Sequence, residues 1–291
     1  MSDITLINDS EQSSLVTNGL AKNGEMYLKK AGSTDAGSIV VYDSGSWRAF
    51  ENEYAPAGNW AGNTYAVNLD GSNDYIDCGG DADFSFTDGA GNDSAFSVSA
   101  WVKLDINVRS RFVAKGNLEW LFTTDSNSRL SFYLWGSDGT STYLQRFETA
   151  TLSTGTWHNI VATYDGSNTV GGLNLYRAGS SITTSTATPG TYAGIASQQG
   201  ALRIGQWPLN SSVMNGLVDE VTLFDYELTA SQVSDIYNSG VPSDISSLSP
   251  LGWWRMGDDD SGSGTTITDQ GSGGNNGTLV NGPTFSTDVP S

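Results

Sequence analysis

The most informative stretch of the sequence is Gly216-Leu-Val-Asp-Glu-Val-Thr-Leu-Phe-Asp-Tyr-Glu-Leu228. Its alternating pattern predicts a strand with one mostly apolar face. That face comprises Leu217, Asp219, Val221 and Leu223. A lone carboxylate among apolar side chains is costly to bury. We therefore expect Asp219 to bind a metal or to accept backbone N–H bonds.

A short helix is predicted directly after this strand. Thr229 is a suitable N-cap, and Gln232 three residues later completes a capping box. The apolar stripe of the helix consists of Val233, Ile236 and Tyr237. Gly240 fits the C′ position and Pro242 blocks continuation, so the helix is expected to be short.

The strand pattern G-x-(I/V)-D-E-V, followed by L-(T/S)-x-x-(Q/E)-(V/I), resembles the closing segment of laminin-G-like, concanavalin A-like jelly rolls. Three further stretches are similar to that family in the same order: residues 69–76 (LDGSNDYI), 96–102 (FSVSAWV) and 156–166 (TWHNIVATYDG). Together they span roughly residues 65–237. The resemblance implies an all-β fold, a concanavalin A-like jelly-roll β-sandwich. It does not fix function, because the fold hosts lectins, enzymes and structural modules.

The C-terminal tail resembles the beginning of a laminin-G-like domain, although it follows the rest of the chain. The resemblance lies in Trp253, Trp254 and the later TDQGSGGNNGTL run. We expect a circular permutation, in which the tail strands complete this chain's own sandwich or that of a neighbour. The alternative is a truncated second repeat.

The expected organisation has four parts. They are an N-terminal arm and small β module for assembly or attachment (1–52), a linker (53–64), the jelly roll (65–245) and the tail strands (246–291). Segment 1–19 lacks a pattern and is expected to be disordered or to fold on a partner. Short strands are predicted within 24–30, 38–43 and 47–50. The motif IVVYDSGSWRAF there resembles segments of tailed-phage virion proteins.

Composition limits the possible partners. The 291 residues contain 32 acidic and 13 basic side chains, a net charge of −19, which argues against nucleic-acid binding. The excess of acids supplies cation ligands or simply a solvated acidic surface. Cys78 is the only cysteine, so no intrachain disulfide is expected. We expect its side chain to be buried and to pack as a small hydrophobic residue. The sequence shows neither a signal peptide nor an apolar run long enough for a transmembrane helix, so we expect synthesis in a cytoplasm without membrane insertion.

Calcium is the expected cofactor, because the resemblance implies a structural Ca²⁺ near the ends of the first and last strands. The candidate ligands are Asp70, Asp219 and Asp269. The alternative is that these carboxylates accept backbone N–H groups or form turns. The acidic run at 258–260 lacks the alternating spacing of a calcium loop and is predicted to be solvated.

Aromatic side chains are the candidates for glycan binding, since sugar sites combine aromatic rings with polar side chains. The candidates are Trp120, Trp135, Trp207 and Tyr133, with Tyr143 nearby. The alternative is that they pack against loops or subunits. Trp101 and Trp157 lie in family-core motifs and are expected to be buried.

Catalysis is not expected. Concanavalin A-like glucanases carry an E-x-D-x-E strand that places two carboxylates close together, and this sequence has no such pattern. His158 is the only histidine and lies in the predicted Trp-His strand, so no Ser-His-Asp set can be assembled.

The predicted function is that of a non-enzymatic virion structural protein of a tailed phage, made in the host cytoplasm. It would be a capsid decoration, knob or tail-fibre component. The expected partners are other virion proteins, copies of the same chain and host-surface glycans bound by the lectin-like domain. The alternative is an exported carbohydrate-binding adhesion module that belongs to no virion.

Overall fold

The chain separates into two compact units, Met1–Ala57 and Gly58–Ser291. The computed structural model describes residues 62–80, 82–136, 141–198, 200–208 and 213–291, together with the four strands of the first unit. Those strands form one sheet in the order β1 (Thr5–Ile7), β2 (Met26–Lys29), β3 (Ile39–Asp43) and β4 (Ser46–Ala49). The last three match predicted strands, whereas β1 lies where no pattern was found. The rest of segment 1–19 lies outside the described residues.

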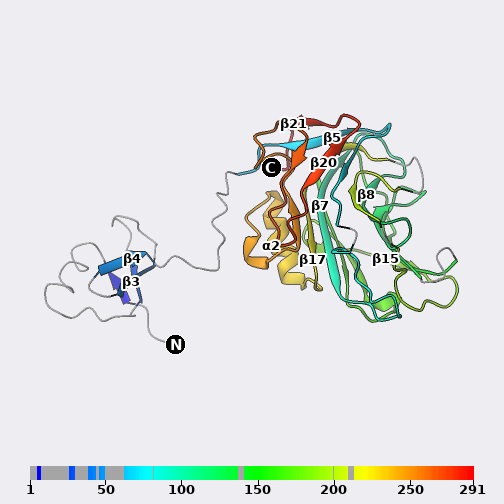
Figure 1. Cartoon of the computed structure of the whole chain (residues 1–291), viewed down its shortest axis with the longest axis horizontal. Coiled ribbons are helices and arrows are strands. Elements are labelled where there is room, and N and C mark those ends of the chain that lie inside the picture. Colours follow the sequence, from blue (N-terminus) through cyan, green and yellow to red (C-terminus); the bar gives the residue numbers. More distant parts are fainter. Residues whose placement is uncertain are drawn as a thin grey trace. The chain divides into compact units, whose positions relative to one another are not determined.

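The second unit is a sandwich of two antiparallel sheets (Figure 1). We call the sheet ordered β15-β11-β10-β9-β8-β16-β6-β20-β19 the front sheet. The back sheet is ordered β14-β13-β12-β7-β17-β5-β21, with β18 paired to β17. The prediction of an all-β sandwich is confirmed.

The strand bounds are as follows. The front sheet contains β15 (Thr184–Ala187), β11 (Tyr143–Glu148), β10 (Leu130–Trp135), β9 (Trp120–Thr124), β8 (Arg111–Lys115), β16 (Leu202–Ile204), β6 (Tyr75–Asp77), β20 (Gly277–Val280) and β19 (Thr266–Ile267). The back sheet contains β14 (Ser180–Ser181), β13 (Leu173–Arg177), β12 (His158–Tyr164), β7 (Phe96–Leu104), β17 (Asn215–Phe224), β5 (Ala66–Asp70), β21 (Thr284–Ser286) and β18 (Gly252–Trp254). Among the described residues, the helical elements are α2 (Ala230–Tyr237) and the 3-10 turns η1 (Val170–Gly172), η2 (Asn238–Gly240) and η3 (Ser246–Leu248).

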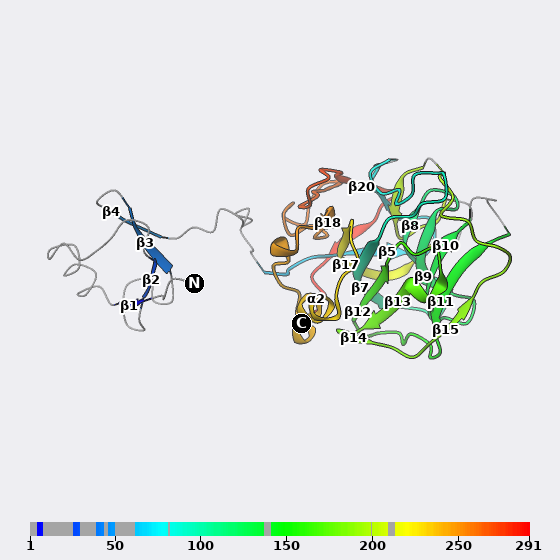
Figure 2. The ribbon, with the colours of Figure 1, turned by 90° about the horizontal axis from the view of Figure 1, so that it is seen from below.

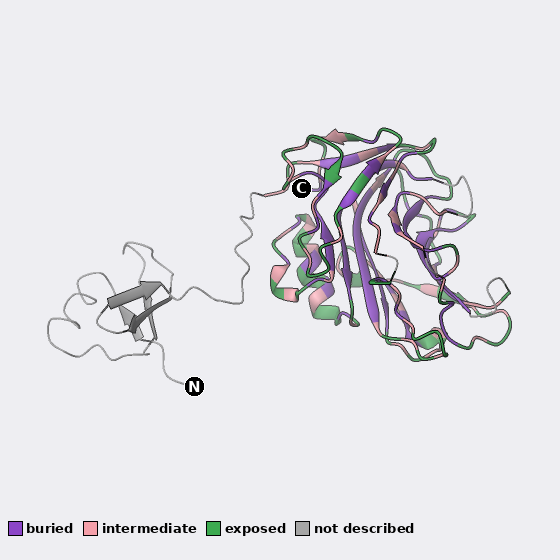
Figure 3. Cartoon of the chain, in the orientation of Figure 1, coloured by how far each residue is buried: buried purple, intermediate pink, exposed green. Residues whose placement is uncertain are grey.

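The main core lies between the two sheets. Figure 2 shows β7, β12 and β13 in one layer and β8, β9 and β10 in the other. Alternation along each strand sends every second side chain inward. In β7 the inward residues are those predicted: Phe96, Val98, Ala100, Val102 and Leu104. Buried residues accordingly line the long strands β7 and β17 (Figure 3), and Cys78 is a free, buried side chain in this core, as expected.

Two predicted segments differ from the structure. Segment 69–76, predicted as one strand, splits into β5 of the back sheet and β6 of the front sheet. The turn between them uses Gly71, where φ is 76° and a Cβ atom would lie 2.4 Å from the Asn215 side chain. Segment 183–196, predicted as a loop, contains the edge strand β15.

A β-bulge in β17 turns the side chain of Asp219 to the opposite face from the one predicted. The pairing of β17 with β7 shifts register between Asp219 and Thr222, and Glu220 has φ 46°. The extra residue lets Val218 and Val221 both face the core. The prediction that Asp219 shares a face with Val221 is therefore wrong.

The tail strands close the sandwich of their own chain. β18 pairs with the second half of β17, β20 pairs with β6, and β21 pairs with β5. Trp254 is fully buried in the main core, and its Nε1 donates to the carbonyl of Asn275 at 2.8 Å. The tail therefore fills part of the core and pairs with β5 and β6, which precede β21 and β20 by more than 200 positions.

The predicted helix is present as α2. Thr229 is its N-cap and forms the predicted capping box with Gln232. The helix ends earlier than expected, because Asn238 adopts the left-handed conformation of the C-cap, so Gly240 is not the C′ residue. Val233 and Ile236 pack on the outer face of the back sheet. No helix in the described part of the chain has the length and apolarity needed to cross a bilayer.

Candidate functional site

Four aromatic side chains gather on the outer face of the front sheet. Tyr133 and Trp135 lie two residues apart on β10 and therefore point to the same side. Their rings stack 5.2 Å apart at 13°, and the Trp135 ring stacks on Trp207 at 5.3 Å and 20°. Tyr143 of β11 meets Tyr133 edge-on at 5.6 Å. Trp207 and the two tyrosines remain partly exposed.

Polar side chains border these rings. The Gln145 amide donates to the Tyr133 hydroxyl at 2.6 Å and to the Ser131 hydroxyl at 2.9 Å. The Trp207 indole donates to the carbonyl of Asn117 at 2.8 Å, which fixes the ring over the β8–β9 turn. We call the set Arg111, Tyr133, Trp135, Tyr143, Gln145 and Trp207 the aromatic site.

Arg111 is the unusual member of the aromatic site. Its guanidinium lies 5.1 Å from the centre of the Trp207 ring, and its side chain is 3% exposed. Nη1 donates to the Thr123 hydroxyl at 3.0 Å, whereas Nε and Nη2 have no hydrogen-bond partner. Burial, reinforced by the nearby charge of Arg109, lowers the pKa of Arg111 to about 10. The site therefore contains a buried positive charge without a carboxylate partner among the described residues.

Three of the four predicted glycan-binding residues meet in the aromatic site, namely Tyr133, Trp135 and Trp207. Trp120 does not. It is fully buried in the main core, where its indole donates to the carbonyl of Phe84 at 3.0 Å. Because β9 turns Trp120 and Phe122 inward, the Trp120 ring offers no face to a sugar, and the prediction is wrong for this residue.

Sequence reasoning missed Arg111, and the reason is local. The pairing of β8 with β9 shifts register between Arg111 and Val113, so both Phe112 and Val113 join the core. Simple alternation would have placed Arg111 and Val113 on one face. A bulge of this kind leaves no clear pattern in the sequence. The only sign of it is that Arg111 is followed by two apolar residues in a row, Phe112 and Val113.

The structure does not bring the three candidate calcium ligands, Asp70, Asp219 and Asp269, together in one cluster. In the described part of the chain, no three Asp, Glu, His or Cys side chains are arranged to hold a metal. Asp269 already accepts the backbone N–H groups of Trp253, Gly271 and Asn275 at 2.7–2.8 Å. Asp70 caps a turn through the backbone N–H of Ser72 at 2.7 Å. Calcium therefore stays a prediction from the resemblance.

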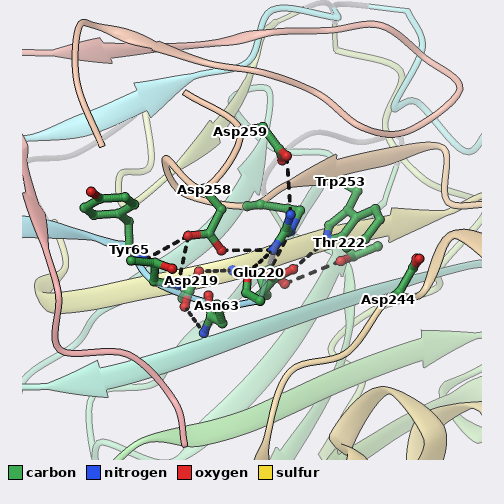
Figure 4. A network of polar contacts seen from close by, with 12 residues as sticks. Asn63, Tyr65, Asp219, Glu220, Thr222, Asp244, Trp253, Asp258 and Asp259 are labelled. Atoms are coloured by element: carbon green, nitrogen blue, oxygen red, sulfur yellow. Dashed lines mark hydrogen bonds and ion pairs between the residues drawn. The ribbon is translucent and has the colours of Figure 1, made fainter. Parts of the chain in front are cut away.

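Asp219 belongs instead to a buried polar network (Figure 4). Its carboxylate accepts from the Asn63 amide at 2.9 Å and from the backbone N–H of Glu220 at 2.8 Å. Glu220 accepts from the Trp253 indole at 2.6 Å and forms an ion pair with Arg255 at 3.2 Å. Burial raises the pKa of Asp219 well above its usual value, because the charged form is poorly solvated there.

Two acids from the 258–260 run complete this network. Arg255 pairs with Asp258 at 3.0 Å and with Asp259 at 3.3 Å. Asp258 also accepts the backbone N–H groups of Thr64 and Tyr65, both at 2.9 Å. The prediction of a solvated loop is wrong for Asp258, whose side chain is 1% exposed. The Arg255 guanidinium in the tail thus bonds to Glu220 of β17 and to the Gly62 carbonyl in the segment before β5.

This network predicts that the fold loses stability as the pH rises. Burial raises the pKa of Glu220 from 4.5 to about 7. Its stabilising contribution is therefore complete below pH 4.5 and is lost as the pH rises through 7, an effect on the order of 2 kcal/mol. Between pH 5 and pH 8 the melting temperature should fall by several degrees more in the native chain than in Glu220→Gln. Equal falls in both chains would show that Glu220 does not titrate in this range.

Comparisons with known proteins agree with the architecture. A family model described as the concanavalin A-like lectin/glucanases superfamily matches residues 70–234, more than half of the chain. No curated protein sequence matches. A Bacteroides ovatus protein, provisionally described as carbohydrate-binding, has a similar structure with 18% identity and a TM-score of 0.56, covering 92% of this chain and 71% of its own. At that identity the likeness shows the fold alone.

A second similar structure is domain 4 of AbnA, an extracellular arabinanase of Geobacillus stearothermophilus, in complex with arabinotriose. It covers 77% of this chain and 95% of its own, with 17% identity and a TM-score of 0.40.

Proposed function

The chain belongs to the concanavalin A-like lectin/glucanases superfamily, and from that premise we propose that it binds carbohydrate through the aromatic site. The supporting observation is the stack of Tyr133, Trp135 and Trp207 on the outer face of the front sheet. Such rings offer apolar faces to the C–H groups of a sugar, while flanking polar side chains bind its hydroxyls. Gln145 and the tyrosine hydroxyls supply those polar groups here.

The proposed role is binding without catalysis. Glycoside hydrolysis needs two carboxyl groups facing one sugar bond. The adjacent acids Asp219 and Glu220 are 0% and 5% exposed and already bonded within the fold, so a sugar does not reach them. No acid belongs to the aromatic site itself.

Carbohydrate binding is tested by applying the full-length protein to an array of oligosaccharides. We expect saturable binding to at least one class of glycan. We expect a Trp207→Ala chain to lose it. An array on which the native chain binds nothing would overturn the proposal.

We further propose that the protein serves in the virion of a tailed phage, with the first unit attaching it and the sandwich displayed for host adsorption. The support is the resemblance of the IVVYDSGSWRAF segment to virion proteins. The alternative is an exported adhesion module. The two are separated by the mass in solution of the full chain and of a chain starting at Asn52. An oligomer that becomes a monomer on truncation would support the virion role, whereas monomers in both cases would favour the alternative.

A further inference from the structure

We infer that the aromatic site selects acidic saccharides and that Arg111 binds the carboxylate or sulfate group of the sugar. This inference rests on the proposed carbohydrate binding and specifies the class of glycan. The observation that carries it is the guanidinium edge of Arg111 that lacks a partner.

The two Arg111 nitrogens without a partner, Nε and Nη2, are the two that commonly bind an oxyanion together. Nε and Nη2 lie on one edge of the guanidinium, and neither has a hydrogen-bond partner. The same two nitrogens of Arg129 donate to Asp125 Oδ2 at 2.9 and 2.6 Å, so this chain already uses that edge to hold a carboxylate. A fork of two parallel N–H donors fits a carboxylate or sulfate ester and gives charge-assisted bonds.

The charge around Arg111 favours an anionic ligand. Two nearby groups shift the pKa of Arg111: Arg109, which has the same sign, lowers it, and the Tyr133 hydroxyl, which is neutral near pH 7, raises it. The chain carries 32 acidic residues, yet no described one pairs with Arg111. An uncompensated buried charge is costly, and a bound anion would relieve that cost.

Binding must involve Trp207, because its ring lies over the guanidinium and leaves Arg111 only 3% exposed. An acidic group reaches the free edge when the Trp207 indole gives up its hydrogen bond to the Asn117 carbonyl and the side chain shifts to stack beside the sugar. A change in tryptophan fluorescence should therefore accompany the binding of acidic saccharides.

The test uses an array that carries uronate, sialate and sulfate-ester saccharides, each beside its neutral counterpart. We expect the full-length protein to prefer at least one acidic member over its counterpart by about tenfold or more. Arg111→Met should remove that preference. Arg203→Met is the matched control, because Arg203 also lies over a ring, that of Tyr75 at 4.5 Å, but pairs with Asp77. It should keep the preference.

Stability provides a second measurement. Since Arg111 is buried without a counter-charge, Arg111→Met should melt at the same or a higher temperature than the native chain without ligand. Equal binding of acidic and neutral members would overturn the inference and leave carbohydrate binding standing. Binding of no member at all would overturn both. A preference that survives Arg111→Met would show that another residue carries it.

A different observation points to a second site, on the outer face of the back sheet. A cavity of about 490 Å³ lies there beside α2. Its walls include Trp101, Trp157, His158, Asn159 and Tyr237. The rings of Trp101 and Tyr237 stack 5.9 Å apart at 22°. Trp157, expected to be buried, is partly exposed here and donates to Asp288 at 3.0 Å.

Asn159 supplies this cavity with a donor and an acceptor that have no partner in the protein. The residue is 1% exposed, and neither its Nδ2 nor its Oδ1 has a hydrogen-bond partner. Lys103 at the wall is paired with Asp288, and burial lowers the pKa of His158, so neither of these two side chains brings an unpaired charge to the cavity near neutral pH. A ligand that offers a donor beside an acceptor would satisfy the amide.

We propose that this cavity binds a neutral sugar through two neighbouring hydroxyl groups held by Asn159. The test is a proton NMR titration of the full-length protein with glucose, galactose, mannose, xylose and N-acetylglucosamine. His158 is the only histidine, so its ring signals report on the cavity without ambiguity. We expect saturable shifts with at least one sugar and their loss in both Asn159→Leu and Asn159→Asp. No shift with any of the five, or shifts that persist in both variants, would overturn this proposal.

Discussion

Replacing Arg255 with leucine is expected to destabilise the sandwich by about 3–5 kcal/mol. The Arg255 guanidinium is 3% exposed and forms ion pairs with Glu220, Asp258 and Asp259 at 3.0–3.3 Å. It also donates to the carbonyl of Gly62 at 2.6 Å. Without it, several carboxyl groups would stay buried and uncompensated. Denaturant unfolding of both chains measures the loss.

Two controls make this result specific. Arg203→Leu also removes an ion pair, but the side chains of Arg203 and its partner Asp77 are 25% and 32% exposed, so the change should cost about 1 kcal/mol or less. The deficit of Arg255→Leu should shrink at pH 5, because the acids take up protons instead of bearing an uncompensated charge. A loss no larger than that of Arg203→Leu would contradict the structural role assigned to this network.

The second large effect is expected from Trp207→Ala. This residue supplies one partly exposed ring of the aromatic site and covers Arg111. Truncating a central aromatic contact typically costs 2 kcal/mol or more, so the affinity for glycan should fall by about thirtyfold. Isothermal titration calorimetry with the best saccharide of the array measures the change.

The fold should survive this substitution, because Trp207 lies outside the main core. Tyr75→Ala is the matched control. Tyr75 is a partly exposed ring under an arginine on the same sheet, but it does not belong to the aromatic site. Equal affinities of the native and Trp207→Ala chains, with Tyr75→Ala unchanged, would exclude Trp207 from binding.

The architecture could be predicted because its signals are local. Alternation in β7 and the capping box of α2 depend only on neighbouring residues, and both are present as expected. The facing of Asp219 and of Arg111 could not be predicted, because a bulge adds one residue to each strand and reverses the alternation. Burial that depends on residues distant in the sequence could not be predicted either. Asp258 is buried because it accepts hydrogen bonds from the backbone N–H groups of Thr64 and Tyr65, almost 200 positions earlier.

The candidate site was predicted in part for the same reason. Tyr133 and Trp135 share a face by simple alternation, and Trp207 joins them through the fold. Trp120 was indistinguishable from these residues by type, yet its strand turns it into the core. Residue type alone therefore identifies candidate aromatic residues, and strand register determines which of them lie on the outer face of the sheet.

The most direct test of the central claim is a structure of the full-length protein with the best-binding saccharide of the array. We predict that the sugar lies on the outer face of the front sheet, with its ring against Trp207 or Tyr133 and its acidic group bonded to Arg111. A saccharide bound elsewhere, with the aromatic site empty, would contradict it.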